Sequence, residues 1–379
     1  MFIDWLKVSQ THKEDLPRVG DTVRITIDKA TGDVLHSSEP RYKLEGSYST
    51  SIHIVIQGRT VTVDGNPSRI NRQDNLFGFQ AVQDCINVYN SILAEYGIPP
   101  FTKCTERYLK DGKSGARAGD WTADGACIER VDLTTNVAVG KDNVAAYLRG
   151  LSTQRVGHSI GRLFPNGWSV DWTTSGAGTG VRLQYRKAYA KAEELRTKLL
   201  PRIRRTLGEA SPEYGYALKL HEYCLETGLV RFEQELKSEY LKREHLSFWG
   251  LFDENRYTLL HDEFLKTDEK LKVNSMDLAG ITEQLILEHV VDTPKAARTT
   301  AMYAIEWMQG VKHDRTKRAF ETHAARLNRI GINIRNSCDI SNVSTVFVRQ
   351  VREVNPVKEL TPPSWYVKPV APSHLRLVA

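Results

Sequence analysis

Two tyrosines in a basic segment are the side chains of this sequence best suited to chemistry. Tyr185 and Tyr189 are each followed, two positions later, by a lysine: Lys187 and Lys191. A tyrosine hydroxyl that attacks a phosphate needs cations nearby, because they lower its pKa from about 10 and balance the charge of the phosphate. The segment therefore indicates a tyrosine nucleophile. The alternative interpretation is a basic amphipathic helix whose tyrosines only pack.

Two carboxylates follow an arginine by two positions, in stretches that we predict to be strands. They are Asp132 after Arg130 and Glu233 after Arg231. Because side chains alternate across a strand, each arginine lies on the same face as its carboxylate. The two carboxylates could converge on Mg²⁺ or Mn²⁺, which prefer oxygen ligands and would polarise a phosphodiester. The alternative is two structural salt bridges.

The composition is that of an ordinary globular protein with a mildly basic charge balance. The 379 residues include 52 basic and 46 acidic side chains, which gives a net charge of +6 and weakly favours a polyanionic partner. No apolar run approaches the roughly 20 residues needed to span a bilayer, and no secretory signal is visible, so we expect no membrane association. The five cysteines form no CxxC pair, which argues against a disulfide framework or structural zinc and favours a reducing cytoplasm.

Two well-known chemistries are not indicated by the sequence. It has no His-x-His pair, so the usual signature of HUH endonucleases is missing. It also lacks a Walker A loop, which argues against an ATP-driven helicase.

Hydrophobic periodicity predicts the elements that must position these residues. Strands are expected within 20–65, at 126–134 and at 228–237, and helices at about 80–96, 143–151 and 212–226. Residues 100–126 are predicted to be a loop, and 173–179 a hairpin turn. A helix is expected to begin near Lys187, which would place Tyr185 and Tyr189 on one helical face. From residue 240 onward, helices dominate the prediction.

The predicted fold class is α+β. We expect an N-terminal mixed α/β domain over 1–245, built on an antiparallel-type sheet, and a mainly helical domain over 246–360. A Pro-rich tail follows over 361–379. The two Arg-x-(Asp/Glu) strands could mark two similar halves of the first domain.

Several short segments, taken in order, resemble the gene II replication proteins of filamentous bacteriophages, the phage/plasmid replication II/X family. Ala188-Tyr189-Ala190-Lys191 with Glu194-Leu195 resembles the Ala-Tyr-x-Lys…Glu-Leu tyrosine motif of that family. Asp74 is a departure, because the family usually has His there. The matching segments are 65–69, 74–78, 129–134, 169–172, 188–195, 228–233, 240–242 and 364–370.

The resemblance implies rolling-circle replication. A tyrosine, Tyr189 or alternatively Tyr185, would cut the plus strand of a supercoiled circular duplex at the origin, hold the 5′ phosphate and later rejoin the displaced strand. Lys191 would bind the phosphate or assist proton movement, and Asp132 and Glu233 would hold Mg²⁺ or Mn²⁺. A host helicase and a host polymerase would be partners in the host cytoplasm. The residues expected to contact DNA are Arg69, Arg130, Arg182, Arg186, Lys187 and Arg231.

Two other functions remain open from the sequence. A non-catalytic origin-binding or regulatory protein would bind DNA without cutting it, and a metal-dependent nuclease would cut with water and form no adduct. The C-terminal helical region could also bind DNA, or it could be an ordinary helical hairpin. Met276 lies where an internal start would yield a shorter protein that contains only this region.

Overall fold

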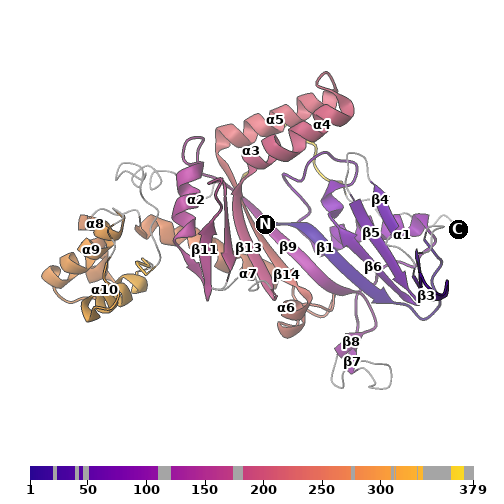
Figure 1. Ribbon diagram of the computed structural model, residues 1–379, viewed down its shortest axis with the longest axis horizontal. Coiled ribbons are helices and arrows are strands. Elements are labelled where there is room, and N and C mark those ends of the chain that lie inside the picture. The colour runs from indigo at the N-terminus through magenta and orange to yellow at the C-terminus, as the bar shows by residue number, and fades with distance from the viewer. Residues whose placement is uncertain are drawn as a thin grey trace. The chain divides into compact units, whose positions relative to one another are not determined.

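The fold is described from a computed structural model, drawn as a ribbon in Figure 1. The chain divides into two compact units, which are treated separately below. The first unit comprises Met1–Thr134, Glu235–Thr258 and Pro362–Ala379, and the second comprises Thr135–Gln234 and Leu259–Thr361. The structure describes residues 1–19, 24–38, 42–45, 51–109, 121–173, 182–274, 278–308, 311, 313–330, 332–335 and 360–370.

An antiparallel sheet forms the centre of the first unit. Its strands lie in the order β9 (Cys127–Ala138), β1 (Phe2–Thr11), β6 (Thr60–Gly65), β5 (Ser51–Gln57) and β4 (Tyr42–Glu45). Alternate residues of β6 are buried, as expected for a strand with one apolar face. Helix α1 (Val82–Glu95) is fixed on this sheet by Tyr89, whose hydroxyl donates to the carbonyl oxygens of Leu6 at 2.7 Å and Gly65 at 2.9 Å.

Smaller elements complete the first unit. They are the pair β2 (Arg24–Ile27) and β3 (Val34–Ser38), the 3-10 turn η2 (Pro67–Arg69), the pair β7 (Arg107–Leu109) and β8 (Trp121–Ala123), and helix α6 (Ser238–Arg243). The pair β7–β8 corrects the prediction that 100–126 is entirely loop. Cross-strand pairing, such as that of Leu109 with Trp121, stabilises these short strands despite the polar, Gly-rich segment between them.

A second antiparallel arrangement builds the second unit. Its strands lie in the order β10 (Arg155–Val156), β11 (Ser159–Leu163), β12 (Ser169–Thr173), β13 (Gln184–Ala190) and β14 (Leu229–Lys237). One face is apolar and packs against helix α2 (Val144–Ser152) and the Phe264 side chain of α7 (Asn255–Asn274). The core residues that the strands supply are Val156, Val170, Trp172, Ala188, Ala190, Val230 and Phe232.

The predicted helix near Lys187 is wrong, because this stretch is strand β13. The strand continues to Ala190 and pairs with β12, with Tyr189 opposite Ser169 and Lys187 opposite Asp171. Cross-strand pairing and the burial of the alternate alanines outweigh the helical tendency of an Ala- and Lys-rich segment. Alternate side chains of a strand share a face, so Tyr185, Lys187 and Tyr189 all lie on the face that points away from the apolar core.

Helices follow β13 directly. They are α3 (Lys191–Glu194), the π-helix η4 (Leu195–Leu199), α4 (Leu200–Leu207) and α5 (Pro212–Thr227), and α5 lies beside α3 and α4 (Figure 1). The hydroxyl of Ser211 caps α5 by accepting from the backbone N–H of Tyr214. Gly228 ends α5 with a φ of +60°, a conformation that favours glycine. The predicted hairpin turn at 173–179 lies outside the described residues, apart from residue 173.

The C-terminal helices of the second unit have a core of their own. They are α8 (Leu278–Leu287), α9 (Pro294–Met308) and α10 (Arg318–Arg329). Ile281, Ala301, Phe320 and Leu327 are among the side chains that they bury together. Met276, the candidate internal start, lies outside the described residues.

The predicted α+β class, with an antiparallel sheet and helices toward the C-terminus, is thus confirmed. The predicted domain boundaries remain predictions. Within the described part of the chain, none of the helices has both the length and the apolar character to span a membrane.

Candidate active site

Tyr189, Glu233 and Lys187 form a hydrogen-bonded cluster on the polar face of the second unit. The hydroxyl of Tyr189 donates to Glu233 Oε1 at 2.5 Å, and Lys187 Nζ lies 2.6 Å from Glu233 Oε2. Lys187 Nζ is also 5.6 Å from the centre of the Tyr189 ring. The glutamate therefore contacts the phenol with one oxygen and a cation with the other, so the predicted tyrosine and the predicted carboxylate are brought together.

Glu233 is held as a carboxylate although it is buried. Burial by itself raises the pKa of its carboxyl group, but the charges of Lys187 and Arg231 and the hydrogen bonds from Lys187 and Tyr189 outweigh burial, so the pKa lies below its ordinary value. An ionised carboxylate that accepts the phenolic hydrogen bond is placed to receive the phenolic proton.

Tyr185 has a different environment. Its hydroxyl donates to Asp171 Oδ2 at 3.1 Å, and Asp171 is paired with Arg162 at 2.9 Å. Burial, followed by the charge of Asp171 and this hydrogen bond, raises the pKa of Tyr185 to about 12. A phenol with a raised pKa is a poorer nucleophile near neutral pH, so these surroundings do not activate Tyr185.

Lys191 is buried beside the cluster. Only 1 % of the residue is exposed, and its Nζ lies 2.8 Å from Glu194 Oε2 and 6.0 Å from the centre of the Tyr189 ring. Burial alone would raise the pKa of Glu194, but the charge of Lys191 lowers it to about 2. The ammonium group of Lys191 thus lies near the Tyr189 ring, where its positive charge acts on the phenol.

An open pocket of about 540 Å³ gives access to both tyrosines. Its wall contains cations, hydroxyl groups and aromatic rings, together with the carboxylates of Glu193 and Glu194, and Glu193 pairs with Arg196 at 2.7 Å. The π-helix η4 supplies three consecutive residues, and such helices occur often at functional sites. The lining side chains that bear on function are Phe164, Asn166, Trp168, Ser169, Tyr185, Lys187, Tyr189, Arg196, Thr197 and Lys198.

The remaining arginines predicted to contact DNA have varied positions. Arg231 is fully buried and its Nε donates to Asn136 Oδ1 at 3.0 Å, so it acts on the site through Glu233 rather than on its surface. Arg186 lies on the opposite face of β13, with its guanidinium 5.9 Å from the centre of the Phe264 ring. Arg182 is exposed just before β13. Arg69 lies in η2 of the first unit and donates to the carbonyl oxygen of Gln73 at 3.1 Å.

Asp132 belongs to the first unit and is paired with its own arginine. Arg130 donates to both oxygens of Asp132, at 2.8 and 2.7 Å, and also lies 3.5 Å from Glu235. A divalent ion bound by Asp132 would have to displace this arginine, and one bound by Glu233 would have to displace Lys187. The described residues contain no group of three or more His, Cys, Asp or Glu placed to hold an ion. The arrangement seen therefore does not fit the predicted metal, and no chemical step is derived through it.

One sequence motif of hydrolases occurs here in the wrong structural context. Gly157-His158-Ser159-Ile160-Gly161 matches Gly-x-Ser-x-Gly, but it forms the hairpin between β10 and β11, where Val156 pairs with Ser159. A nucleophile elbow requires a strand, a sharp turn and a helix. We therefore assign Ser159 no catalytic role.

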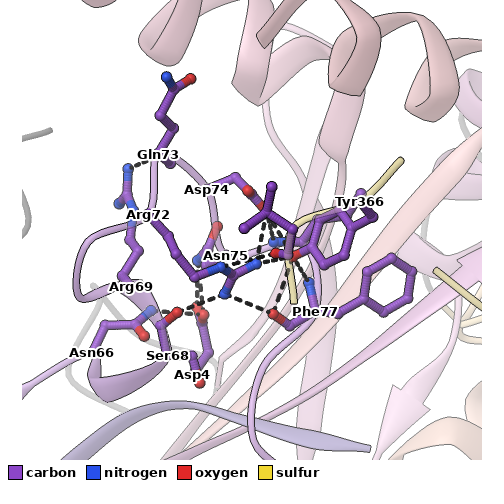
Figure 2. A network of polar contacts seen from close by, with 12 residues as sticks. Asp4, Asn66, Ser68, Arg69, Arg72, Gln73, Asp74, Asn75, Phe77 and Tyr366 are labelled. Atoms are coloured by element: carbon purple, nitrogen blue, oxygen red, sulfur yellow. Dashed lines mark hydrogen bonds and ion pairs between the residues drawn. The ribbon is translucent and has the colours of Figure 1, made fainter. Parts of the chain in front are cut away.

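A buried polar network in the first unit was not foreseen (Figure 2). The hydroxyl of Tyr366 donates to Asp74 Oδ1 at 2.8 Å and accepts from the backbone N–H of Phe77 at 2.9 Å. Arg72 donates to the same hydroxyl, to the carbonyl oxygen of Ser68 at 2.6 Å and to that of Val367 at 3.1 Å. The segment 360–370 is thereby fixed to the loop that follows η2.

This network gives Asp74 a structural role. Asp74 is 2 % exposed and also accepts from the backbone N–H of Leu76 at 2.7 Å. Beside it, Asp4 accepts from the side-chain amides of Asn66 at 2.9 Å and Asn75 at 2.7 Å (Figure 2). The signal in the sequence was the resemblance of segments 74–78 and 364–370 to one family. Contact between segments almost 300 residues apart has no local signature.

Comparisons with known proteins define the class of this chain. Residues 1–254 match the family of the N-terminal part of the phage replication-associated gene II protein, and residues 285–372 match the family of its C-terminal part. The first match alone covers more than half of the chain and contains the whole Tyr189 cluster. The class is thus that of replication-associated proteins.

A curated relative agrees with both matches. The chain is 45% identical over 326 residues to the replication-associated gene II protein of Escherichia phage If1, which covers 86% of this chain and 99% of the relative. No solved structure matches the chain. The chain belongs to the gene II family of filamentous-phage replication-associated proteins, as the resemblance indicated.

Proposed function

We propose that this protein initiates rolling-circle replication by cutting the plus strand of a supercoiled circular duplex at its origin through a covalent tyrosine intermediate. The observation that carries the proposal is the hydrogen bond from Tyr189 to the ionised Glu233, beside Lys187 and within an open pocket that contains further cations. Membership of the gene II family supports the link to replication.

The proposed step is a transesterification in which atoms and charge balance. The Tyr189 oxygen attacks the scissile phosphorus, and its proton passes to Glu233. A bond forms between phosphorus and the tyrosine oxygen while the bond to the 3′ oxygen breaks. That oxygen takes up a proton from water and leaves as a hydroxyl group, and Glu233 returns the tyrosine proton to the solvent. Lys187 balances the negative charge that develops on the phosphate. Because the number of phosphoester bonds is unchanged, the strand can later be rejoined without a nucleotide cofactor.

Tyr189 suits this step better than Tyr185. Tyr189 lies in the segment that resembles the tyrosine motif of the family, and it donates to a carboxylate that two cations hold in the ionised form. In this proposal, Tyr185 lines the pocket without taking part in the reaction, and buried Asp171 holds its hydroxyl. The role of Lys191 is to hold Glu194 and the start of α3 next to the tyrosine.

The remaining parts of the proposal follow from the reaction. The free 3′ hydroxyl would prime synthesis by a host polymerase, a host helicase would displace the cut strand, and both would act in the host cytoplasm. Mg²⁺ or Mn²⁺ dependence through Asp132 and Glu233 stays a prediction, to be tested by cutting assays with and without a chelator.

The experiment is incubation of supercoiled origin plasmid with the protein and Mg²⁺. The expected products are open circles and a protein–DNA adduct that survives SDS. Tyr189→Phe is expected to abolish both while origin binding persists, and Tyr185→Phe serves as the matched control that keeps cutting. The reverse pattern would assign the reaction to Tyr185.

Two other results would replace the proposal. Binding that is sensitive to salt, without any cutting, would indicate a regulatory DNA-binding protein. Open circles without an adduct would indicate hydrolysis by water. Mapping the peptide that remains on the DNA identifies the tyrosine directly.

A further inference from the structure

The turn between β11 and β12 supplies aromatic residues to the pocket of Tyr189. Phe164, Asn166 and Trp168 all line this pocket. The turn is fixed to the strand that carries the tyrosine, because the backbone N–H of Ala190 donates to the carbonyl oxygen of Trp168 at 3.0 Å. Trp168 therefore lies next to the cross-strand pair of Ser169 and Tyr189.

The turn is well ordered by its own hydrogen bonds. Asn166 Oδ1 accepts from the backbone N–H of Trp168 at 3.0 Å, and the backbone N–H of Phe164 donates to the carbonyl oxygen of Ser169 at 2.9 Å. These bonds fix the backbone of the turn, and the Trp168 side chain packs in addition against the apolar core. A rigid ring loses little conformational freedom on binding, which favours affinity.

Binding a phosphate gives no reason for aromatic rings in this wall. Phe164 is 36% exposed, and Trp168 is only partly buried, with one side packed against the core. Cations alone, such as Lys187 and Lys198, would bind the backbone of a nucleic acid. Aromatic rings beside such cations are the combination that binds unpaired nucleotides, because bases stack on the rings while phosphates contact the cations.

We infer that the turn 164–168 is a nucleobase subsite, in which Trp168 stacks on an unpaired base next to the scissile phosphate. The exposed ring of Phe164 forms the second wall, and the amide of Asn166 lies within the same pocket to contact the edge of the base. The inference rests on the proposed function for the position of the phosphate. Base binding itself requires no cutting.

Trp168 is then a specificity-determining residue for the strand that Tyr189 cuts. A base can reach the indole only when it has left the duplex, so the nucleotide beside the cut must be unpaired in the complex. The opposing view is that both aromatic residues only cover the edge of the apolar core, and the experiment below separates the two.

The test is a double-mutant cycle between the protein and the DNA. Single-stranded origin oligonucleotides, each with one abasic position near the cut, are titrated against the Tyr189→Phe protein, and binding is followed by fluorescence anisotropy. The same titrations are repeated with Trp168→Ala added. Trp121→Ala is the matched control, because Trp121 is 47% exposed and lies in the first unit.

The expected result is specific to one nucleotide. Trp168→Ala weakens binding of the intact strand by roughly 5- to 150-fold, which is the range for the loss of one stacked base. Removal of the base at one position next to the cut weakens DNA binding by the parent protein by a similar factor. The same removal does not change DNA binding by the Trp168→Ala variant. Trp168→Phe restores most of the affinity, and Trp121→Ala binds like the parent.

Some outcomes overturn the inference and one affects only the proposed function. The subsite is refuted if Trp168→Ala and the parent bind the intact strand equally. It is also refuted if the abasic position weakens binding by Trp168→Ala as much as it weakens binding by the parent. If Trp168→Ala fails to fold, Phe164→Ala decides by the same criterion. If the coupling is present but wild-type protein cuts nothing, the subsite stands and the proposed nicking falls.

Discussion

Removal of the Lys187 cation tests the electrostatic description of the site most directly. In Lys187→Met the stem of the side chain is kept, but Glu233 loses the charge 2.6 Å from its Oε2. The glutamate side chain is only 9% exposed, whereas that of the lysine is 40% exposed. Removal of one partner from a fully buried ion pair costs several kcal/mol, whereas removal from an exposed pair costs little. For this partly buried pair we expect a loss of about 1–2 kcal/mol in the free energy of unfolding near pH 7.

The loss of stability in Lys187→Met depends on pH through the pKa of Glu233. In the wild type the pKa of Glu233 lies below its ordinary 4.5, so the group adds stability above about pH 4.5 that disappears as the pH falls through its lowered folded pKa. Without Lys187 the pKa of Glu233 rises, because burial is then opposed only by the remaining partners. The difference between wild type and Lys187→Met is therefore larger at pH 7 than at pH 4.

The assay is urea unfolding of both proteins at pH 4 and pH 7. Lys141→Met is the matched control, because Lys141 pairs with Glu226 at the surface, where both side chains are about half exposed. It should show no resolvable loss. A loss for Lys187→Met that is the same at both pH values would refute the reasoning.

Three further predictions concern other parts of the chain. Tyr366→Phe removes the hydroxyl that donates to buried Asp74 and should lower the free energy of unfolding by about 1–3 kcal/mol, measured by urea titration; an unchanged midpoint would contradict the network. Gly228→Ala places a methyl group 2.0 Å from the carbonyl oxygen of Gly140 and should destabilise clearly more than Gly97→Ala, where φ is also positive but the space is open and the cost is about 1–2 kcal/mol. Asp132 is paired with Arg130, so Asp132→Ala should retain cutting across a Mg²⁺ titration; loss of Mg²⁺-dependent cutting would instead support the predicted role of Asp132 as a metal ligand.

The sequence predicted the chemical residues better than the local structure that carries them. Tyr189 and Glu233 were chosen for residue type and for motif, and they do form a hydrogen bond. The sequence predicts a helix from about Lys187, but the segment of Tyr189 forms strand β13. Its strand conformation depends on pairing with β12 and on the buried side of the sheet, neither of which is visible in a local window.

Burial and long-range partners could not be predicted from the pattern of residues. Arg231 and Arg130 have the same spacing to a carboxylate, yet Arg231 is fully buried whereas Arg130 is partly exposed. Arg130 pairs with Asp132, as the salt-bridge alternative to a metal site requires. Tyr185 was a candidate equal to Tyr189 by spacing. The structure gives the two tyrosines different carboxylate partners, Asp171 for Tyr185 and Glu233 for Tyr189, and neither partner could be read from the spacing.

The position of Tyr366 has a consequence for the biosynthesis of the protein. Synthesis proceeds from the N-terminus. Arg72 and Asp74 therefore leave the ribosome almost 300 residues before Tyr366, whose hydroxyl forms hydrogen bonds with both side chains. Until then Arg72 and Asp74 have only their local partners, such as the carbonyl oxygen of Ser68 and the backbone N–H of Leu76. A chain that terminates early never forms the bonds to Tyr366 and is exposed to cellular proteases, which remove incompletely folded proteins. Only a polypeptide translated as far as Tyr366 completes its own N-terminal unit.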